Sequence, residues 1–208
     1  MKEKILFVCL GNICRSPAAD GIMKHMVKER GIAHHFIIDS CGIGAWHVGQ
    51  LPDSRMRRHG HDHGYCFDHR ARQISKTDFD MFDHIIVMDR ENLRAINSMA
   101  PSDSARAKVK LMANYLRHHD NYNVVPDPYY GTDHDFEVVI ELLEDACEGL
   151  IEEMLGDKGS HKWPSQEIYR KEGSEKTIVF NFLNFFNFLN FFNFLNFFNF
   201  LELSTSET

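Results

Sequence analysis

The chain has 208 residues, with 23 lysines and arginines against 30 aspartates and glutamates, so its formal net charge is −7. This length allows one domain with an appendage, and a core large enough to fold without disulfides or metals. An acidic chain matches the phosphate backbone of nucleic acids poorly, so we expect no nucleic-acid partner. The five cysteines have no zinc-like spacing and no secretory signal opens the chain, which predicts a cytoplasmic protein.

A strand, a loop and a helix are predicted at the start of the chain. Residues 5–8 are an apolar run, typical of a strand buried on both faces. Ser16 followed by Pro17 is a helix-start signal, with the serine as N-cap. Between them lie residues 9–15. A loop that leads into a helix N-terminus points successive backbone N–H groups into one concavity, which favours a tetrahedral oxyanion.

This loop carries a cysteine and an arginine separated by five residues, Cys9 and Arg15. Gly11 and Asn12 are residue types that tolerate a left-handed backbone, which such a loop often needs. The partial positive charge of the loop and the guanidinium favour the thiolate form of Cys9. A thiolate beside a phosphate-shaped cradle is suited to nucleophilic attack on phosphorus.

Strands and helices alternate along the rest of the chain. The predicted helices are 17–30, 51–60, 90–99 and one that starts at 132 or 133, and the later strands are 34–39, 83–89 and 107–112. This alternation predicts an α/β fold with a single open sheet of four parallel strands and helices on both faces.

Basic and histidine side chains cluster around the short helix at 51–60. Three histidines, His59, His61 and His63, could suggest a metal, but no carboxylate except Asp62 lies at a usual ligand spacing. We interpret them as solvated loop histidines and expect no metal. The neighbouring arginines are interpreted as solvated helix charges rather than a substrate-binding patch; they are Arg55, Arg57 and Arg58.

The last segment, residues 158–208, is predicted to be a polar linker followed by a low-complexity tail, outside a domain of residues 1–157. Residues 181–201 are seven copies of Asn-Phe-Leu or Asn-Phe-Phe, a period that suits neither helix nor strand. The seven asparagines oppose membrane insertion, so no span is expected. Such repeats are prone to self-association, and the alternative is a translated simple repeat without a role.

The segment 9–17, Cys-Leu-Gly-Asn-Ile-Cys-Arg-Ser-Pro, resembles the signature loop of the low-molecular-weight protein tyrosine phosphatases. The resemblance continues in order through four further blocks, at 39–49, 69–74, 88–89 and 127–131, and covers about residues 2–156. It implies hydrolysis of phosphotyrosine in proteins through a phosphocysteine intermediate, with no metal or organic cofactor.

The resemblance also implies roles for individual residues. Cys9 would be the nucleophile, Arg15 would bind phosphate oxygens, and Asp127 would be the general acid and then the base. The phosphate-binding loop would further comprise Leu10, Gly11, Asn12, Ile13, Cys14 and Ser16. Ser40 would hydrogen-bond the asparagine of that loop, and the pocket walls would be Trp46, Tyr129 and Tyr130.

Three other functions are compatible with parts of this sequence but fit it less well than a phosphotyrosine phosphatase. Arsenate reductases share this loop but use further cysteines, and Cys66 and Cys147 supply no adjacent redox pair. A non-catalytic phosphoprotein-binding module is disfavoured by the intact catalytic set. Phosphoarginine phosphatases resemble this loop with threonine where Ile13 stands, so Ile13 favours phosphotyrosine. Independently, Cys14 is predicted to trap oxidised Cys9 as a reversible disulfide.

Overall fold

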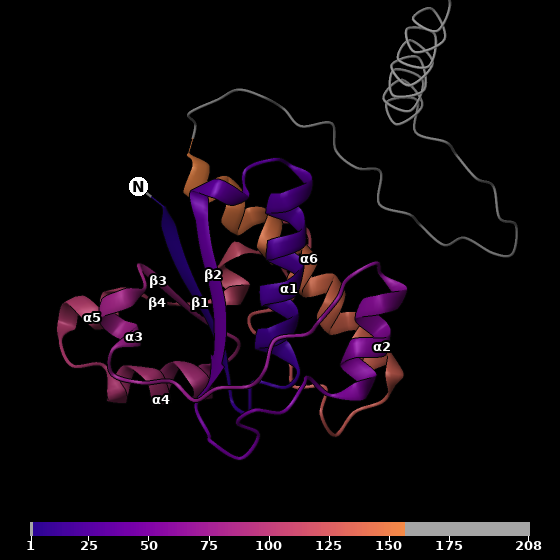
Figure 1. Ribbon diagram of the computed structural model, residues 1–208, viewed down its shortest axis with the longest axis horizontal. Coiled ribbons are helices and arrows are strands. Elements are labelled where there is room, and N and C mark those ends of the chain that lie inside the picture. Colours follow the sequence, from indigo (N-terminus) through magenta and orange to yellow (C-terminus); the bar gives the residue numbers. More distant parts are fainter. Residues whose placement is uncertain (1, 157–208) are drawn as a thin grey trace, which may run out of the picture. The chain divides into compact units, whose positions relative to one another are not determined.

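The computed structural model describes residues 2–156, which form an open sheet of four parallel strands (Figure 1). The strands are β1 (Glu3–Cys9), β2 (Phe36–Gly42), β3 (His84–Val87) and β4 (Val109–Leu111). Their order across the sheet is β2-β1-β3-β4. The predicted α/β fold is confirmed. The predicted repeat tail lies outside the described residues.

Helices cover both faces of this sheet, as predicted. One face carries α1 (Arg15–Glu29) and α6 (Asp133–Leu155), and α2 (Ser54–Asp62) packs on α6. The other carries α3 (Asp78–Met81), α4 (Arg90–Met99) and α5 (Asp103–Ala107). The two 3₁₀ turns are η1 (Ala33–His35) and η2 (Met112–Tyr115). None of the helices in the described part of the chain is both long and apolar enough to cross a membrane.

Strand β1 is an inner strand of the sheet, and its side chains contribute to the cores on both faces. Its alternating side chains face opposite layers, so Ile5 and Phe7 join the core under α1 and α6, while Leu6 and Val8 join the core under α3, α4 and α5. All four are fully buried. The crossover after β1 runs through α1 on one face and the crossover after β3 runs through α4 on the other. A crevice therefore opens at the carboxyl end of β1, where open α/β sheets bind ligands.

The start of α1 differs from the prediction. The helix begins at Arg15, and the N-cap position is Cys14, which makes no side-chain capping bond. Ser16 therefore lies inside the first turn, and the prediction that it caps the helix is wrong. Its hydroxyl is instead directed to the preceding loop and to the carbonyl of Cys41. The predicted stop at Gly31 fits its left-handed backbone, with a φ of 68°.

Helix α2 runs past its predicted end. Asp53 caps it by accepting the N–H of Arg55, and the helix continues to Asp62. Gly60 does not end the helix; a Cβ at this position would lie 2.2 Å from the ring of Phe67. The ring of Phe67 leaves no room for a side chain at this position, so the glycine is there for packing. The prediction that it ends the helix is wrong.

Two of the three clustered histidines face α6. His59 is buried and bonds the carboxylate of Glu137, and His63 Nε2 lies 2.7 Å from the other oxygen of that carboxylate. The prediction of solvated loop histidines is wrong for His59, which lies inside α2 and is buried against α6. It holds in part for His63, which lies in the exposed turn after α2 but bonds the acidic face of α6. His61 is the most exposed of the three, with a side chain that is 88% exposed. Among residues 2–156, no group of three or more potential ligands is arranged to hold a metal.

The contact between His63 and Glu137 predicts a pH-dependent stability. Burial lowers the pKa of His63, but the hydrogen bonds and negative charges of Glu137 and Glu144 together outweigh it, so the pKa is raised overall. A raised folded-state pKa stabilises the protein below the unfolded value of about 6.5, and the stabilisation disappears as the pH rises through the folded value. We expect His63→Gln to cost ~1 kcal/mol of unfolding free energy at about pH 6 and less at about pH 9.

Urea unfolding of the full chain at both pH values measures this difference. The control is His61→Gln, which removes an exposed imidazole of the same helix. An equal cost for His63→Gln at both pH values would show that the ion pair contributes no pH dependence.

Candidate active site

Residues 10–14 connect β1 to α1, and Asn12 is the residue that turns the loop. It has a left-handed backbone, with a φ of 57°. Its side-chain amide donates to Ser16 Oγ at 2.9 Å and to Ser40 Oγ at 3.0 Å, and its Oδ1 accepts the backbone N–H of Arg72 at 2.9 Å. These bonds hold a backbone conformation that is unfavourable for a non-glycine residue. The contact with Ser40 is the one that the family resemblance implies.

The end of β2 lies directly against this loop. A Cβ at Gly42 would be 3.0 Å from the carbonyl carbon of Gly11 and 3.1 Å from the nitrogen of Asn12. Two residues later, a Cβ at Gly44 would be 1.8 Å from the ring of Trp46. The glycines of this turn therefore let one chain segment support the loop and hold the tryptophan at its edge.

The thiol of Cys9 lies at the bottom of the loop, with the residue only 3% exposed. Its sulfur accepts the backbone N–H of Asn12 at 3.3 Å and lies 3.0 Å from Ser16 Oγ. The same hydroxyl lies 3.2 Å from the carbonyl oxygen of Cys41. The single hydroxyl hydrogen thus has two acceptors. It can turn to the sulfur when that sulfur is a thiolate, and to the carbonyl when it is a thiol.

The rest of the loop offers unused donors. Within the described residues, the backbone N–H groups of Gly11, Ile13 and Cys14 have no protein acceptor. They lie beside the N-terminus of α1, whose partial positive charge adds to theirs. Such a group of free N–H donors is a binding site for a tetrahedral anion.

Arg15 is buried beneath this site and held by acidic groups. Nη1 donates to Asp89 Oδ2 at 2.6 Å and to the carbonyl of Val125 at 3.2 Å, and Nη2 donates to Asp127 Oδ2 at 2.6 Å. Burial would lower the pKa of Arg15, but the negative charges of Cys9, Asp127 and Asp89 outweigh it and raise the pKa. Its Nε is buried without a hydrogen-bond partner in the described residues. That N–H remains a donor for a bound anion.

Asp127 reaches the arginine from the loop before α6. Its Oδ1 accepts the backbone N–H of Tyr129 at 3.2 Å, and its side chain is 43% exposed. One carboxylate oxygen is therefore fixed by its own loop while the other faces the buried guanidinium. The group is open to a substrate that enters from solvent.

A cavity of about 240 Å³ brings these groups together. Its lining residues are Cys9, Leu10, Gly11, Ile13, Cys14, Arg15, Trp46, His47, Asp127, Tyr129 and Tyr130. Every site residue predicted from the sequence lines it except Asn12, Ser16 and Ser40, which are buried behind the loop. Trp46 and Tyr130 are 70% and 97% exposed, so they form the rim of the cavity.

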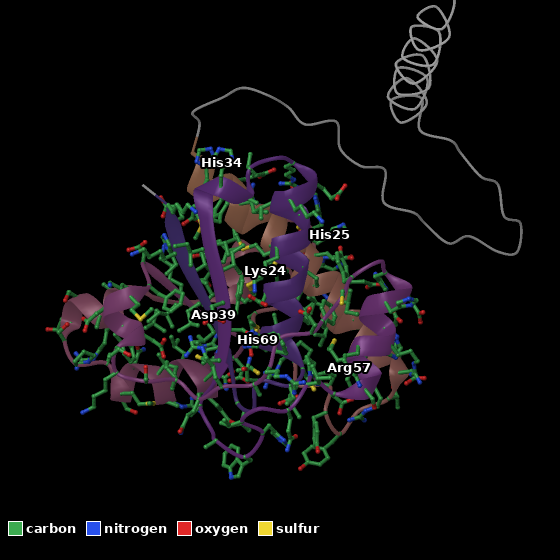
Figure 2. The ribbon with its side chains drawn as sticks, viewed as in Figure 1. Lys24, His25, His34, Asp39, Arg57 and His69 are labelled. Carbon is green, nitrogen blue, oxygen red and sulfur yellow. The ribbon has the colours of Figure 1, made fainter. Side chains whose placement is uncertain are left out.

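Some residues of the site were missed by the sequence analysis. Asp89 follows β3 and caps α4 through the N–H of Asn92, so its position at the carboxyl end of a parallel strand was an available signal. His47 carried no such signal. Arg72 supports the loop through its backbone N–H, and the identity of a side chain does not predict such a contact. Its segment is tied to β2, where His69 Nδ1 lies 3.7 Å from Asp39 (Figure 2).

Cys14 is a buried free thiol in the same loop. Burial, and after it the charge of Cys9, raises the pKa of Cys14. Cys14 therefore stays protonated in the cavity that it shares with Cys9. The disulfide between Cys9 and Cys14 stays a prediction.

Comparison with known proteins agrees with this geometry. A sequence model described as low molecular weight phosphotyrosine protein phosphatase matches residues 4–160. The pig protein of that name is 39% identical over 153 residues, which are 73% of this chain and 96% of the pig protein.

Two solved structures are also similar. A protein tyrosine phosphatase from Entamoeba histolytica, with Hepes in its active site, has a TM-score of 0.72 and 41% identity, covering 74% of this chain and 97% of its own. A Drosophila arginine phosphatase has a TM-score of 0.68 and 34% identity, covering 76% of this chain and 99% of its own. The chain belongs to the low molecular weight phosphotyrosine protein phosphatase family.

Proposed function

We propose that this phosphatase hydrolyses phosphotyrosine in proteins through a phosphocysteine intermediate, with Cys9 as nucleophile. The observation that carries the proposal is the loop between β1 and α1. It places the Cys9 sulfur, free backbone donors and the Arg15 guanidinium in one cavity. A tetrahedral dianion fits this set of donors, and the sulfur lies beneath it.

In the first step the Cys9 thiolate attacks phosphorus and the bond from phosphorus to the tyrosine oxygen breaks. The loop N–H groups and Arg15 stabilise the charge on the three non-bridging oxygens. Asp127 gives its proton to the departing phenolate oxygen. The products of this step are the dephosphorylated tyrosine and an S-phosphorylated Cys9.

In the second step water attacks the phosphorus of the phosphocysteine. Asp127, now ionised, takes a proton from that water, and the bond from phosphorus to sulfur breaks. Inorganic phosphate leaves and Cys9 returns as a thiolate. The hydroxyl of Ser16, 3.0 Å from the sulfur, donates to it and makes it a better leaving group. Neither step needs a metal or an organic cofactor.

The ion pair between Asp127 and Arg15 prepares the acid for this cycle. A phosphate dianion competes with Asp127 for the guanidinium, because both are anions that bind the same N–H groups. Once phosphate oxygens occupy Arg15, Asp127 loses its cationic partner and gains a negative neighbour. The Asp127 carboxyl group is then no longer bonded to Arg15 and can face the leaving oxygen.

The chemistry of the cavity favours phosphotyrosine over the alternatives. Ile13 adds apolar surface where the sequence analysis expects threonine in a phosphoarginine enzyme, and aromatic side chains form the rim. An arsenate reductase would need further cysteines, downstream of the phosphate loop, that form an adjacent redox pair. Cys147 is buried in the core under α6, and Cys66 lines a different cavity, so neither meets that need.

The proposed cellular compartment follows from the chemistry of the two thiols. A nucleophilic Cys9 with a second thiol in the same loop must be kept reduced, which supports a cytoplasmic enzyme. We place the catalytic unit in residues 1–157, since the site is built from the described part of that range, and the substrate is a phosphoprotein.

The test of this function is Asp127→Asn, assayed in the full chain on a series of aryl phosphates. Asparagine cannot donate a proton to the leaving oxygen, and tyrosine, with a pKa of about 10, is a poor leaving group without one. We expect kcat/KM to fall about 10²-fold or more for phosphotyrosine and much less for p-nitrophenyl phosphate.

The control is Asp62→Asn, an exposed carboxylate at the end of α2, which should leave both rates unchanged. Equal losses on both substrates would remove Asp127 from the general-acid role. A phosphoarginine peptide, assayed in parallel with a phosphotyrosine peptide, decides the substrate class.

A further inference from the structure

Arg55, on the first turn of α2, contacts the loop that carries Asp127. Its guanidinium donates to both oxygens of the Asp53 carboxylate, from Nε at 3.0 Å and from Nη2 at 2.9 Å. Nη2 also donates to the carbonyl oxygen of Tyr129 at 3.0 Å. One side chain thus connects the start of α2 with the residue two positions after Asp127. Arg57, further along α2, is labelled in Figure 2 and locates this helix.

The peptide groups of Tyr129 pass this contact on to the carboxylate. Its C=O is held by Arg55, while its N–H donates to Asp127 Oδ1 at 3.2 Å. The position of the carboxylate therefore depends on the position of Tyr129, and that position depends on Arg55. The guanidinium also lies over the ring of Tyr129, with its central carbon 5.6 Å from the ring centroid.

The other end of this connection is attached to the phosphate loop. The backbone N–H of Asp53 donates to the carbonyl oxygen of Ile13 at 2.8 Å. The Asp53 carboxylate caps α2 and fixes the Arg55 fork. Hydrogen bonding to Arg55 lowers the pKa of Asp53, and the bond to Asp53 raises the pKa of Arg55. The pair stays charged at neutral pH.

We propose that Arg55 is a positioning residue that sets the distance between the phosphate loop and the Asp127 carboxylate. The proposal rests on the function proposed above for Asp127. Arg55 does not line the substrate cavity, so it acts through Tyr129 and not on the substrate. The role requires arginine, because a lysine ammonium cannot bond two carboxylate oxygens and a carbonyl from one rigid plane.

The test is Arg55→Met in the full chain, measured as kcat/KM over aryl phosphates whose leaving groups range from p-nitrophenol to tyrosine. Methionine keeps an unbranched stem against Phe136, over whose ring the guanidinium lies at 4.7 Å. A displaced acid slows poor leaving groups most. We expect a loss of about 10-fold for phosphotyrosine and less than about 2-fold for p-nitrophenyl phosphate, a fraction of the full general-acid effect.

The matched control is Arg58→Met on the same helix. Arg58 pairs with Asp133 at 2.6 Å and makes no hydrogen bond or ion pair with residues 127–131 among the described residues. It should keep the wild-type dependence on leaving group. A second variant, Asp53→Asn, keeps a residue that caps helices well but removes the charge that orients Arg55. It should shift the dependence in the same direction as Arg55→Met.

The double variant Arg55→Met with Asp127→Asn separates the possible failures. If Arg55 acts through Asp127, the double variant loses no more than Asp127→Asn alone. The positioning role is overturned if kcat/KM of Arg55→Met or Asp53→Asn depends on the leaving group as that of wild type does. It is also overturned if the double variant loses more activity than Asp127→Asn alone. If Asp127→Asn itself lowers kcat/KM equally for all leaving groups, the general-acid role proposed above for Asp127 fails instead.

Discussion

Cys9→Ser is expected to abolish turnover of p-nitrophenyl phosphate, by at least about 10⁴-fold in kcat, while the protein stays folded. The serine hydroxyl is un-ionised at neutral pH, and the loop donors that favour a thiolate cannot ionise an alcohol to a useful extent. The hydroxyl is close to the thiol in shape, so the contacts with Asn12 and Ser16 can persist.

Two measurements accompany the assay in the full chain. Stabilisation by inorganic phosphate, read as a rise in Tm, should be retained in Cys9→Ser because the cradle and Arg15 are unchanged. Cys66→Ser serves as the control, since this free thiol lines a different cavity and should leave kcat unchanged. Activity of Cys9→Ser near the wild-type level would exclude Cys9 as the nucleophile.

The sequence predicted the phosphate loop because its parts are contiguous. A buried strand, a short loop and a helix leave few possible arrangements for the residues between them, so Cys9 and Arg15 had to meet at the carboxyl end of β1. The capping box at the start of α6 is also local. Thr132 and Asp135 form it, three residues apart, at the helix start that the sequence predicts at 132 or 133.

The supports of that loop could not be predicted in the same way. Arg72 bonds Asn12 through a backbone N–H, and any residue other than proline could supply this group. Asp89 reaches Arg15 across 74 residues of sequence, and Arg55 reaches the Tyr129 carbonyl across the same separation. Such contacts depend on tertiary packing, and periodicity and spacing report only local structure.

The histidines show how a local rule can give a wrong answer. Gly60 has the position and the type of a helix terminator, which favours a loop for the histidines next to it in the sequence. The ring of Phe67 occupies the space where a Cβ would stand, so the glycine serves packing inside a continuing helix. His59, one residue before that glycine, is buried on the helix, and both it and His63 bond Glu137.

Arg15→Lys is expected to reduce kcat/KM for phosphotyrosine by about 10³-fold or more, although the positive charge is kept. In the structure one planar group bonds Asp89 and Asp127 at 2.6 Å each and keeps a third N–H, at Nε, for a ligand. An ammonium has no fixed plane, so it cannot stay bonded to Asp89 and at the same time present a fork to two phosphate oxygens.

The loss should therefore appear in phosphate binding as well as in turnover, which distinguishes Arg15 from Cys9. Inorganic phosphate should raise the Tm of Arg15→Lys much less than that of wild type, whereas Cys9→Ser should respond as wild type does. Arg57→Lys on the exposed part of α2 is the control and should be unaffected in both measurements. If Arg15→Lys kept wild-type phosphate binding and lost only turnover, the guanidinium would act in the chemical step alone. The buried free N–H would then not be part of the anion site.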